Sequence, residues 1–305
     1  MPSKIKLSFL GTGSAIPTAK RNHPAVLLTW KDENILFDCG EGTQRQFRKM
    51  KINPCKITRI CISHWHADHV LGLPGLLQTL GMSGYNKTLK IYIPKGTRKL
   101  LDLYLKMFIR KDWNFKFKVN EVSKGKFVNE KEFFLEAGEM KHDTPTLGYS
   151  FVVKDKKRLD KKKLEKLKLP EKSPLIGELA QGKKIKFKGK TIDGKKLLYE
   201  EKGEKVSYVV DTVNNKNIPK LIKNSDLMVC ESTYSADEQE IAKDHLHMTS
   251  KQVGKIAKKG KIGKLFLIHL SQRYDDGKGE EKILSESRKE FKETNIASDG
   301  DVVEV

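Results

Sequence analysis

The sequence predicts an α/β protein in which helices cover layered β-sheets. Short apolar runs typical of strands alternate with helical patterns in the first and last thirds of the 305-residue chain. Residues 115–153 have mostly strand character. The length allows one large or two ordinary domains, and it is ample for a core that folds without disulfides.

The expected elements follow one another along the whole chain, and no internal repeat is visible. Strand patterns occur at residues 4–10, 25–29, 34–38, 57–62, 89–93, 115–121, 132–136, 148–153, 206–210, 226–230 and 264–269. Helical patterns fall between many of them, at residues 41–50, 72–82, 96–108, 215–223, 249–259 and 280–292.

The composition excludes a polytopic membrane protein, since 32% of the residues are charged and the mean hydropathy is −0.56. The apolar stretch Leu7–Leu10 is too short for a signal peptide, and Val70–Met82 is too short for a membrane span. We therefore expect a soluble, cytoplasmic protein. Cys39, Cys55, Cys61 and Cys230 form no CxxC pair, so neither a disulfide framework nor a cysteine zinc site is expected.

The net charge of +21 is unevenly distributed. Residues 154–196 contain 17 Lys and Arg against 6 Asp and Glu, which places about half of the excess charge in a seventh of the chain. A short helix that Pro170 would end and a hairpin around Gly189 are expected there. A lysine run is either a solvated face or an arm that binds a polyanion. The charge alone does not separate RNA from DNA or an acidic membrane.

The strongest chemical signal is the loop after the strand at 57–62, where four potential metal ligands occur in six residues. His64 and His66 are two positions apart, so in an extended backbone they project to one side and can hold one ion. Asp68 and His69 follow a turn and can reach a second ion nearby. This density predicts metal binding.

Two ions need more ligands than one loop supplies, and three further candidates lie near predicted strand ends. His142 precedes the strand at 148–153, Asp211 follows the strand at 206–210, and His269 ends the strand at 264–269. Taken alone, each residue could as well be a capping or turn residue as a metal ligand. Together they occupy the positions that a site along one edge of a sheet sandwich requires.

These motifs resemble the metallo-β-lactamase superfamily and, within it, the short form of the ribonuclease Z family. The resemblance covers essentially the whole chain. It includes residues 9–13 (FLGTG), 17–22 (PTAKRN), 37–44 (FDCGEGTQ), 64–76 (HWHADHVLGLPGL) and 269–274 (HLSQRY), in the family's order. Residues 169–182, rich in Pro, Gly and Leu, resemble the family's protruding exosite arm. Val213 and Met248 depart from the arginine and serine that the family pattern has at these positions.

The resemblance implies a metallo-β-lactamase-like αβ/βα sandwich over residues 1–305, with residues 154–196 as an inserted tRNA-binding arm. It implies a zinc-dependent endoribonuclease that removes the 3′ trailer from precursor tRNA and leaves a 3′-hydroxyl. It assigns His64, His66 and His142 to one zinc ion, with Asp68, His69 and His269 on the other and Asp211 bridging them. Mn²⁺ or Fe²⁺ could take the same sites.

The same resemblance assigns catalytic roles. Asp68 would be the general base and His247 the general acid, with Glu231 holding the His247 tautomer. On the sequence alone, His245 could compete with His247 for this role. Substrate contacts are expected from the residues of the basic arm and of two loops near the site, namely Lys161, Lys162, Lys163, Lys172, Lys184, Arg21, Asn22, Arg273 and Tyr274.

The expected partners are precursor tRNA and a second copy of the chain, with no membrane and no DNA. A binuclear hydrolase of small phosphodiesters or thioesters is the first alternative, but it would need no basic arm. A non-enzymatic RNA-binding protein is the second, but all seven ligands are present. A nuclease of the superfamily's other RNA branch would need an inserted domain that 305 residues cannot hold. The cleavage position relative to the discriminator base or CCA stays open.

Overall fold

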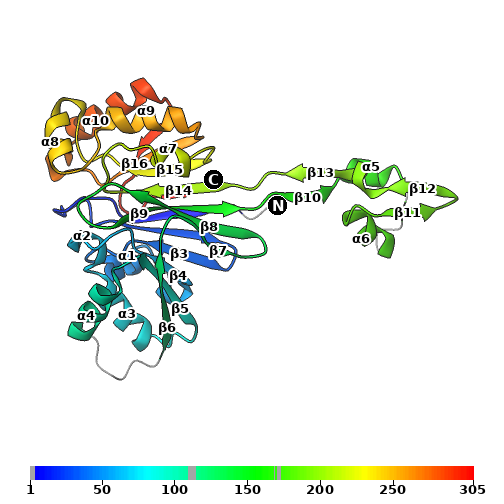
Figure 1. The fold of residues 1–305 in the computed structure, drawn as a ribbon, viewed down its shortest axis with the longest axis horizontal. Helices are drawn as coiled ribbons and strands as arrows, with labels where there is room; N and C mark the ends of the chain where they lie inside the picture. The colour runs from blue at the N-terminus through cyan, green and yellow to red at the C-terminus, as the bar shows by residue number, and fades with distance from the viewer. Residues whose placement is uncertain (1–3, 109–114, 168, 170–172) are drawn as a thin grey trace.

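The computed structural model describes residues 4–108, 115–167, 169 and 173–305, and its main body is a sandwich of two sheets covered by helices (Figure 1). An extension projects far from this body between β9 (Thr146–Val153) and β14 (Lys205–Val209) (Figure 1). The predicted α/β class is confirmed. Among the described helices, none combines the length and the apolar character that crossing a bilayer requires.

The first sheet has seven strands among the described residues, in the order β18-β1-β2-β3-β4-β5-β6. Antiparallel pairing joins β18, β1, β2 and β3, whereas β3 to β6 pair in parallel. These strands are β1 (Lys6–Gly11), β2 (Ala25–Trp30), β3 (Glu33–Phe37), β4 (Arg59–Cys61), β5 (Thr88–Pro94), β6 (Lys116–Val122) and β18 (Val302–Glu304).

The second sheet also has seven strands in the described ranges, in the order β17-β16-β15-β14-β9-β8-β7. Its β14, β15, β16 and β17 run parallel, so their carboxyl ends lie at one edge. The strands are β7 (Gly125–Asn129), β8 (Phe133–Met140), β9 (Thr146–Val153), β14 (Lys205–Val209), β15 (Leu227–Glu231), β16 (Lys264–Ile268) and β17 (Thr294–Ile296).

Helices cover the outer face of each sheet. Those packed on the first sheet or connecting its strands are α1 (Thr43–Lys49), η1 (Pro54–Lys56), α2 (Ala67–Val70), α3 (Leu73–Met82) and α4 (Arg98–Phe108). Those on the side of the second sheet are α7 (Ile218–Leu221), η3 (Ala236–Glu238), α8 (Gln239–Asp244), α9 (Ser250–Gly260), η4 (Gln272–Tyr274) and α10 (Gly277–Glu290).

Strand alternation explains the layered core. Leu7 and Phe9 of β1 pack between the two sheets, whereas Leu10 packs under the helices of the first sheet. Cys39, Cys61 and Cys230 are buried, as expected of small apolar side chains. The central predicted elements are present, but β7, β17, β18 and α8 were missed. The three strands are short edge segments or carry few apolar residues, and α8 has only a short apolar face. None of the four elements therefore shows a clear periodic pattern of apolar residues.

The extension has a neck and a tip. In the neck, β10 (Lys156–Leu159) pairs antiparallel with β13 (Leu198–Glu201), so the paired segment continues past residue 196. The tip contains α5 (Lys161–Glu165), α6 (Pro174–Ala180), β11 (Lys184–Phe187), β12 (Lys190–Asp193) and η2 (Gly194–Leu197). β11 and β12 form the hairpin expected around Gly189, whereas α6 was not predicted. The helix end expected at Pro170 lies outside the described residues.

Candidate metal centre

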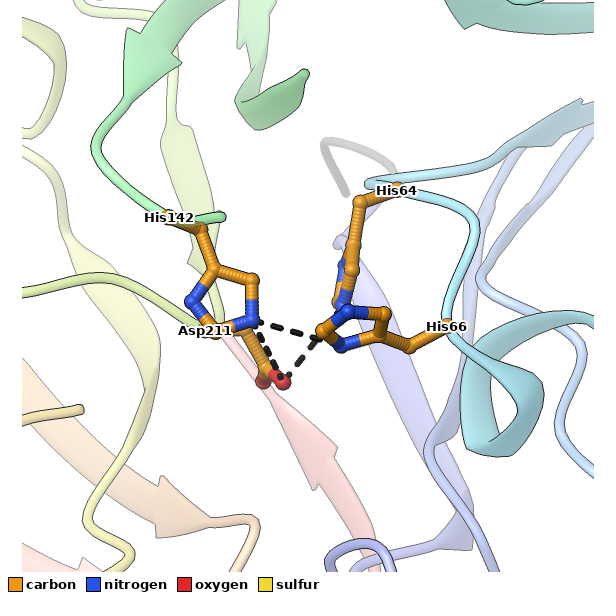
Figure 2. A group of neighbouring side chains, drawn as sticks. All are labelled: His64, His66, His142 and Asp211. Atoms are coloured by element: carbon orange, nitrogen blue, oxygen red, sulfur yellow. Dashed lines mark hydrogen bonds and ion pairs between the residues drawn. The ribbon is translucent and has the colours of Figure 1, made fainter. Parts of the chain in front are cut away.

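The candidate ligands lie in segments that follow strands, at one edge of the sandwich. His64 and His66 are in the loop after β4, and His142 follows β8. Asp211 follows β14. Figure 2 shows the side chains of these four residues converging from both sheets. Their ligand atoms lie within 4.8 Å of one another.

A second group shares Asp211 with the first. Asp68 and His69 stand on α2, directly after the histidine loop, and His269 follows β16. The ligand atoms of this group also lie within 4.8 Å of one another. The structure therefore brings all seven predicted ligands together, in two groups that meet at Asp211.

The distances place Asp211 centrally. Its Oδ2 atom lies 3.5 Å from His64 Nε2 and 3.4 Å from His69 Nε2, and its Oδ1 atom lies 3.1 Å from His269 Nε2. His142 Nε2 is 4.0 Å from Asp211 Oδ2. Asp68 Oδ2 lies 3.3 Å from the Nε2 atoms of both His69 and His269. A carboxylate with histidines on both of its oxygens is suited to bridge two cations.

Unpartnered buried atoms show that the cluster fits metal ions. Within the described residues, His64 Nε2, His69 Nε2 and Asp211 Oδ1 are buried and form no hydrogen bond. Leaving such polar atoms unpaired is costly, whereas a divalent cation uses their lone pairs directly. The donor set contains only imidazole and carboxylate groups, which suits zinc and also manganese or iron.

The pKa shifts of two ligands agree with this, whereas at His69 burial is outweighed by the carboxylates of Asp68, Asp211 and Asp38, which raise its pKa well above its usual value. Burial and the neighbouring imidazole of His69 hold the pKa of His64 well below its usual value, which keeps His64 neutral. Burial opposes ionisation of Asp68, but the imidazoles of His69 and His269 hold its pKa well below the usual range. Ligands must be deprotonated to bind a metal, so the shifts of His64 and Asp68 favour binding, whereas His69 would exchange its proton for the cation.

The backbone of the site is constrained. Asp211 and His269 have φ values of 46° and 58°, in the left-handed region that non-glycine residues rarely occupy. Gly72 of the histidine motif is required by close packing, because a Cβ atom there would lie 2.0 Å from the Gly40 carbonyl oxygen. The metal loop is thereby locked against the segment that follows β3.

His247 stands beside the ligands and is paired with a carboxylate. Its Nδ1 atom lies 3.0 Å from Glu231 Oε2. Burial disfavours the charged form of His247, but Glu231 raises its pKa to about 9. His245 is exposed, and its ring stacks at 6.2 Å on Tyr234. Both histidines line the hollow over the ligands, which has a volume of about 560 Å³, but Glu231 pairs with His247.

The predicted substrate contacts are placed unequally. Lys161, Lys162, Lys163 and Lys184 are exposed on the extension, whereas Lys172 lies outside the described residues. Arg273 is half-exposed at the rim of the hollow and pairs with Glu238. Asn22 is partly buried and donates to the Glu41 carbonyl oxygen.

Two of the predicted contacts need correction because their side chains are enclosed. Arg21 is 3% exposed, and its guanidinium pairs with Asp275 and Glu280. Tyr274 is 6% exposed, and its hydroxyl is bonded to Ser235. Both side chains hold loops of the site in place. The sequence motifs single out Arg21 and Tyr274 but do not show whether their side chains face the substrate or the interior.

Comparison with known proteins gives consistent matches. The chain is 36% identical to a ribonuclease Z of Methanothermobacter thermautotrophicus, over 99% of this chain and 97% of that protein. It is 38% identical to one of Prochlorococcus marinus, over 97% of this chain and 98% of that protein. The crystal structure of human tRNase Z, short form, matches with a TM-score of 0.69 and 25% identity, covering 98% of both chains.

Two further matches concern the fold and the first half of the chain. The metallo-β-lactamase fold protein YhfI from Bacillus subtilis matches with a TM-score of 0.71 and 18% identity, over 99% of this chain and 100% of that one. Residues 5–159 match the family model described as anti-Pycsar protein Apyc1. That model ends at the last residue of β10, so Asp211, His269 and most of the extension lie outside it.

Proposed function

The chain belongs to the ribonuclease Z family, and on that premise we propose that its metal centre removes the 3′ trailer from precursor tRNA with two zinc ions per chain. Family membership makes the chain a tRNA 3′-processing endoribonuclease. Residues 5–159 also belong to the family described as anti-Pycsar protein Apyc1, a relationship that covers only part of the ligand set. The convergence of seven ligands on Asp211 is the observation that carries the proposal.

The ligand groups suggest how two ions would be held. His64, His66 and His142 would bind one ion, Asp68, His69 and His269 the other, and Asp211 both. When bound, two such ions lower the pKa of a water molecule and neutralise charge on phosphate oxygens. Zinc is proposed because histidine and carboxylate ligands in this number are typical of binuclear zinc sites.

Asp68 is proposed as the general base. Its carboxylate faces the centre from α2 and is kept ionised by His69 and His269. It would accept a proton from the attacking water molecule as the water oxygen forms a bond to phosphorus. The bond from phosphorus to the ribose 3′ oxygen then breaks, which leaves a 3′-hydroxyl on the tRNA.

His247 is proposed as the general acid for the leaving 3′ oxygen. Glu231 accepts a hydrogen bond from His247 Nδ1, so the Nε2 atom of His247 is left to donate its proton. The raised pKa of about 9 keeps this imidazole protonated at neutral pH. The ring lies 5.3 Å from that of His269, which places it next to the ligand cluster.

The extension (residues 154–204) is proposed to bind the tRNA body. Its exposed lysines can contact phosphates without reading bases, which suits an enzyme that processes many different tRNAs. β9 runs from the metal centre to the root of the extension, and β14 runs back. The eight residues of β9 separate the two by about 25 Å.

This geometry supports a homodimer. Because the extension leaves the sandwich at the strand ends opposite the metal centre, it points away from the site of its own chain (Figure 1). In the proposed dimer, the extension of one subunit would hold the tRNA whose 3′ end enters the other subunit. The cytoplasm is proposed as the location, since the four cysteines are unpaired, as is typical of a reducing compartment.

The decisive experiment is incubation with a 3′-extended tRNA precursor, with and without a chelator, followed by sequencing of the product ends. We expect a single cut that leaves a 3′-hydroxyl on the tRNA, abolished by chelation and restored by Zn²⁺. Elemental analysis should approach two ions per chain. A fully active enzyme with one ion would contradict the binuclear mechanism.

A further inference from the structure

Two buried carboxylates lie beside the metal centre without belonging to the predicted ligand set. Asp38 follows β3 in the first sheet, and Glu231 ends β15 in the second sheet. Both side chains are fully buried. Each contacts one histidine directly and a second histidine through a hydroxyl group.

Asp38 serves the histidine loop. Its Oδ2 atom lies 2.8 Å from His69 Nδ1 and accepts a hydrogen bond of 2.8 Å from Ser63 Oγ. The same Ser63 Oγ lies 2.9 Å from His64 Nδ1. From the opposite sheet, the Tyr208 hydroxyl also donates to Asp38 Oδ2, at 2.9 Å. The carboxylate is therefore held by both halves of the molecule.

Glu231 repeats this arrangement in the second sheet. Its Oε2 atom lies 3.0 Å from His247 Nδ1 and accepts a hydrogen bond of 2.8 Å from Thr233 Oγ1. Thr233 Oγ1 lies 2.9 Å from His269 Nδ1. The Oε1 atom accepts from the backbone N–H of Thr212 at 2.6 Å, so both Glu231 oxygens are engaged.

The donor count fixes the position of each imidazole hydrogen. A hydroxyl has one hydrogen, which Ser63 and Thr233 give to their carboxylates. Each hydroxyl oxygen can then only accept from the histidine, so His64 and His269 carry hydrogen on Nδ1. The Nε2 atoms of these two histidines consequently present lone pairs, and both lie within 3.5 Å of Asp211 oxygens.

We propose that Ser63 and Thr233 are positioning residues that hold one histidine ligand of each metal group in the tautomer and orientation needed for binding. His64 belongs to the first group and His269 to the second, so the two relays act on different ions. The inference rests on the proposed metal centre and is independent of the RNA substrate. Loss of such an outer contact typically weakens metal binding by about 10- to 100-fold.

The test measures Zn²⁺ affinity by competition with a chromophoric chelator for the full chain and for Ser63→Ala, Thr233→Ala and Thr233→Ser. We expect Ser63→Ala and Thr233→Ala each to weaken one binding step by about 10- to 100-fold. Thr233→Ser keeps the hydroxyl and should bind as the unmodified chain does. Wild-type affinity in both alanine variants would overturn the proposal.

Ser207→Ala is the matched control. Its hydroxyl is equally buried but bonds to Ser150 and Ser225 at 2.7 Å each, away from the ligands. We expect Ser207→Ala to lower thermal stability without changing Zn²⁺ affinity. An equal loss of affinity in this control would show a general packing effect and would also overturn the proposal. If the unmodified chain bound no metal, the proposed function itself would fail, which separates the two outcomes.

Discussion

The metal centre and the extension differ in how their residues are assembled. The ligands run from His64 to His269, and their side chains are mostly buried. The extension is one continuous segment, most of whose described lysines are exposed, and its tip has a small core of Leu179, Ile185 and Leu197. Metal binding needs donor atoms placed to within fractions of an ångström, which only a packed core provides. Phosphate binding through charge tolerates mobile, solvated side chains.

The largest expected effect tests the metal centre. Asp68→Ala should lower the rate of precursor cleavage by at least about 10³-fold, because it removes the proposed proton acceptor and a ligand. Binding of precursor tRNA should be nearly unchanged. Single-turnover cleavage and filter binding measure the two effects, with the exposed Asp102→Ala as control. Cleavage at a near-normal rate would remove Asp68 from its assigned role.

His247→Ala separates acid catalysis from metal binding. The rate should fall by about 10²–10³-fold, while the metal content stays at the wild-type value, since His247 is placed as a proton donor. His64→Ala should instead lose metal. Elemental analysis and single-turnover rates, measured on the same preparations, distinguish the two variants. A His247→Ala protein that has lost zinc would show that His247 is a ligand.

Deletion of the extension tests the other region. Replacing residues 155–203 with a short turn joins β9 to β14, which are antiparallel neighbours. The Kd for precursor tRNA should rise by at least about tenfold, while hydrolysis of a small chromogenic phosphodiester survives, since all seven ligands lie outside the segment. Loss of the small-substrate activity as well would mean that the segment is part of the folded core.

The smallest expected effect concerns single lysines. Lys162→Ala should flatten the plot of log K against log salt by roughly 0.7–0.9 units if its ammonium contacts one phosphate. The rate with saturating precursor should not change. Salt titration of tRNA binding measures the slope, and the exposed Lys223→Ala on the main body is the control. Equal slopes for the unmodified chain, Lys162→Ala and Lys223→Ala would identify the lysines as a solvated face.

The sequence alone was sufficient for features that depend on short-range spacing. The spacing of His64, His66, Asp68 and His69 predicts metal ligands because neighbouring residues share one backbone path. The concentration of lysine in residues 154–196 likewise identifies a charged segment before its shape is known. The strand-end positions of His142, Asp211 and His269 were also visible, although each alone was ambiguous.

Only the tertiary structure decided which side chains face the site. It enclosed Arg21 and Tyr274, left His245 exposed, and gave the contact between Glu231 and His247 that the family resemblance had implied. It also placed Ser63 and Thr233 between buried carboxylates and ligand histidines. Burial and hydrogen bonding depend on residues that are distant in the chain, such as Tyr208 against Asp38. Local sequence spacing carries no information about a contact of this kind, because it forms only when the two sheets pack.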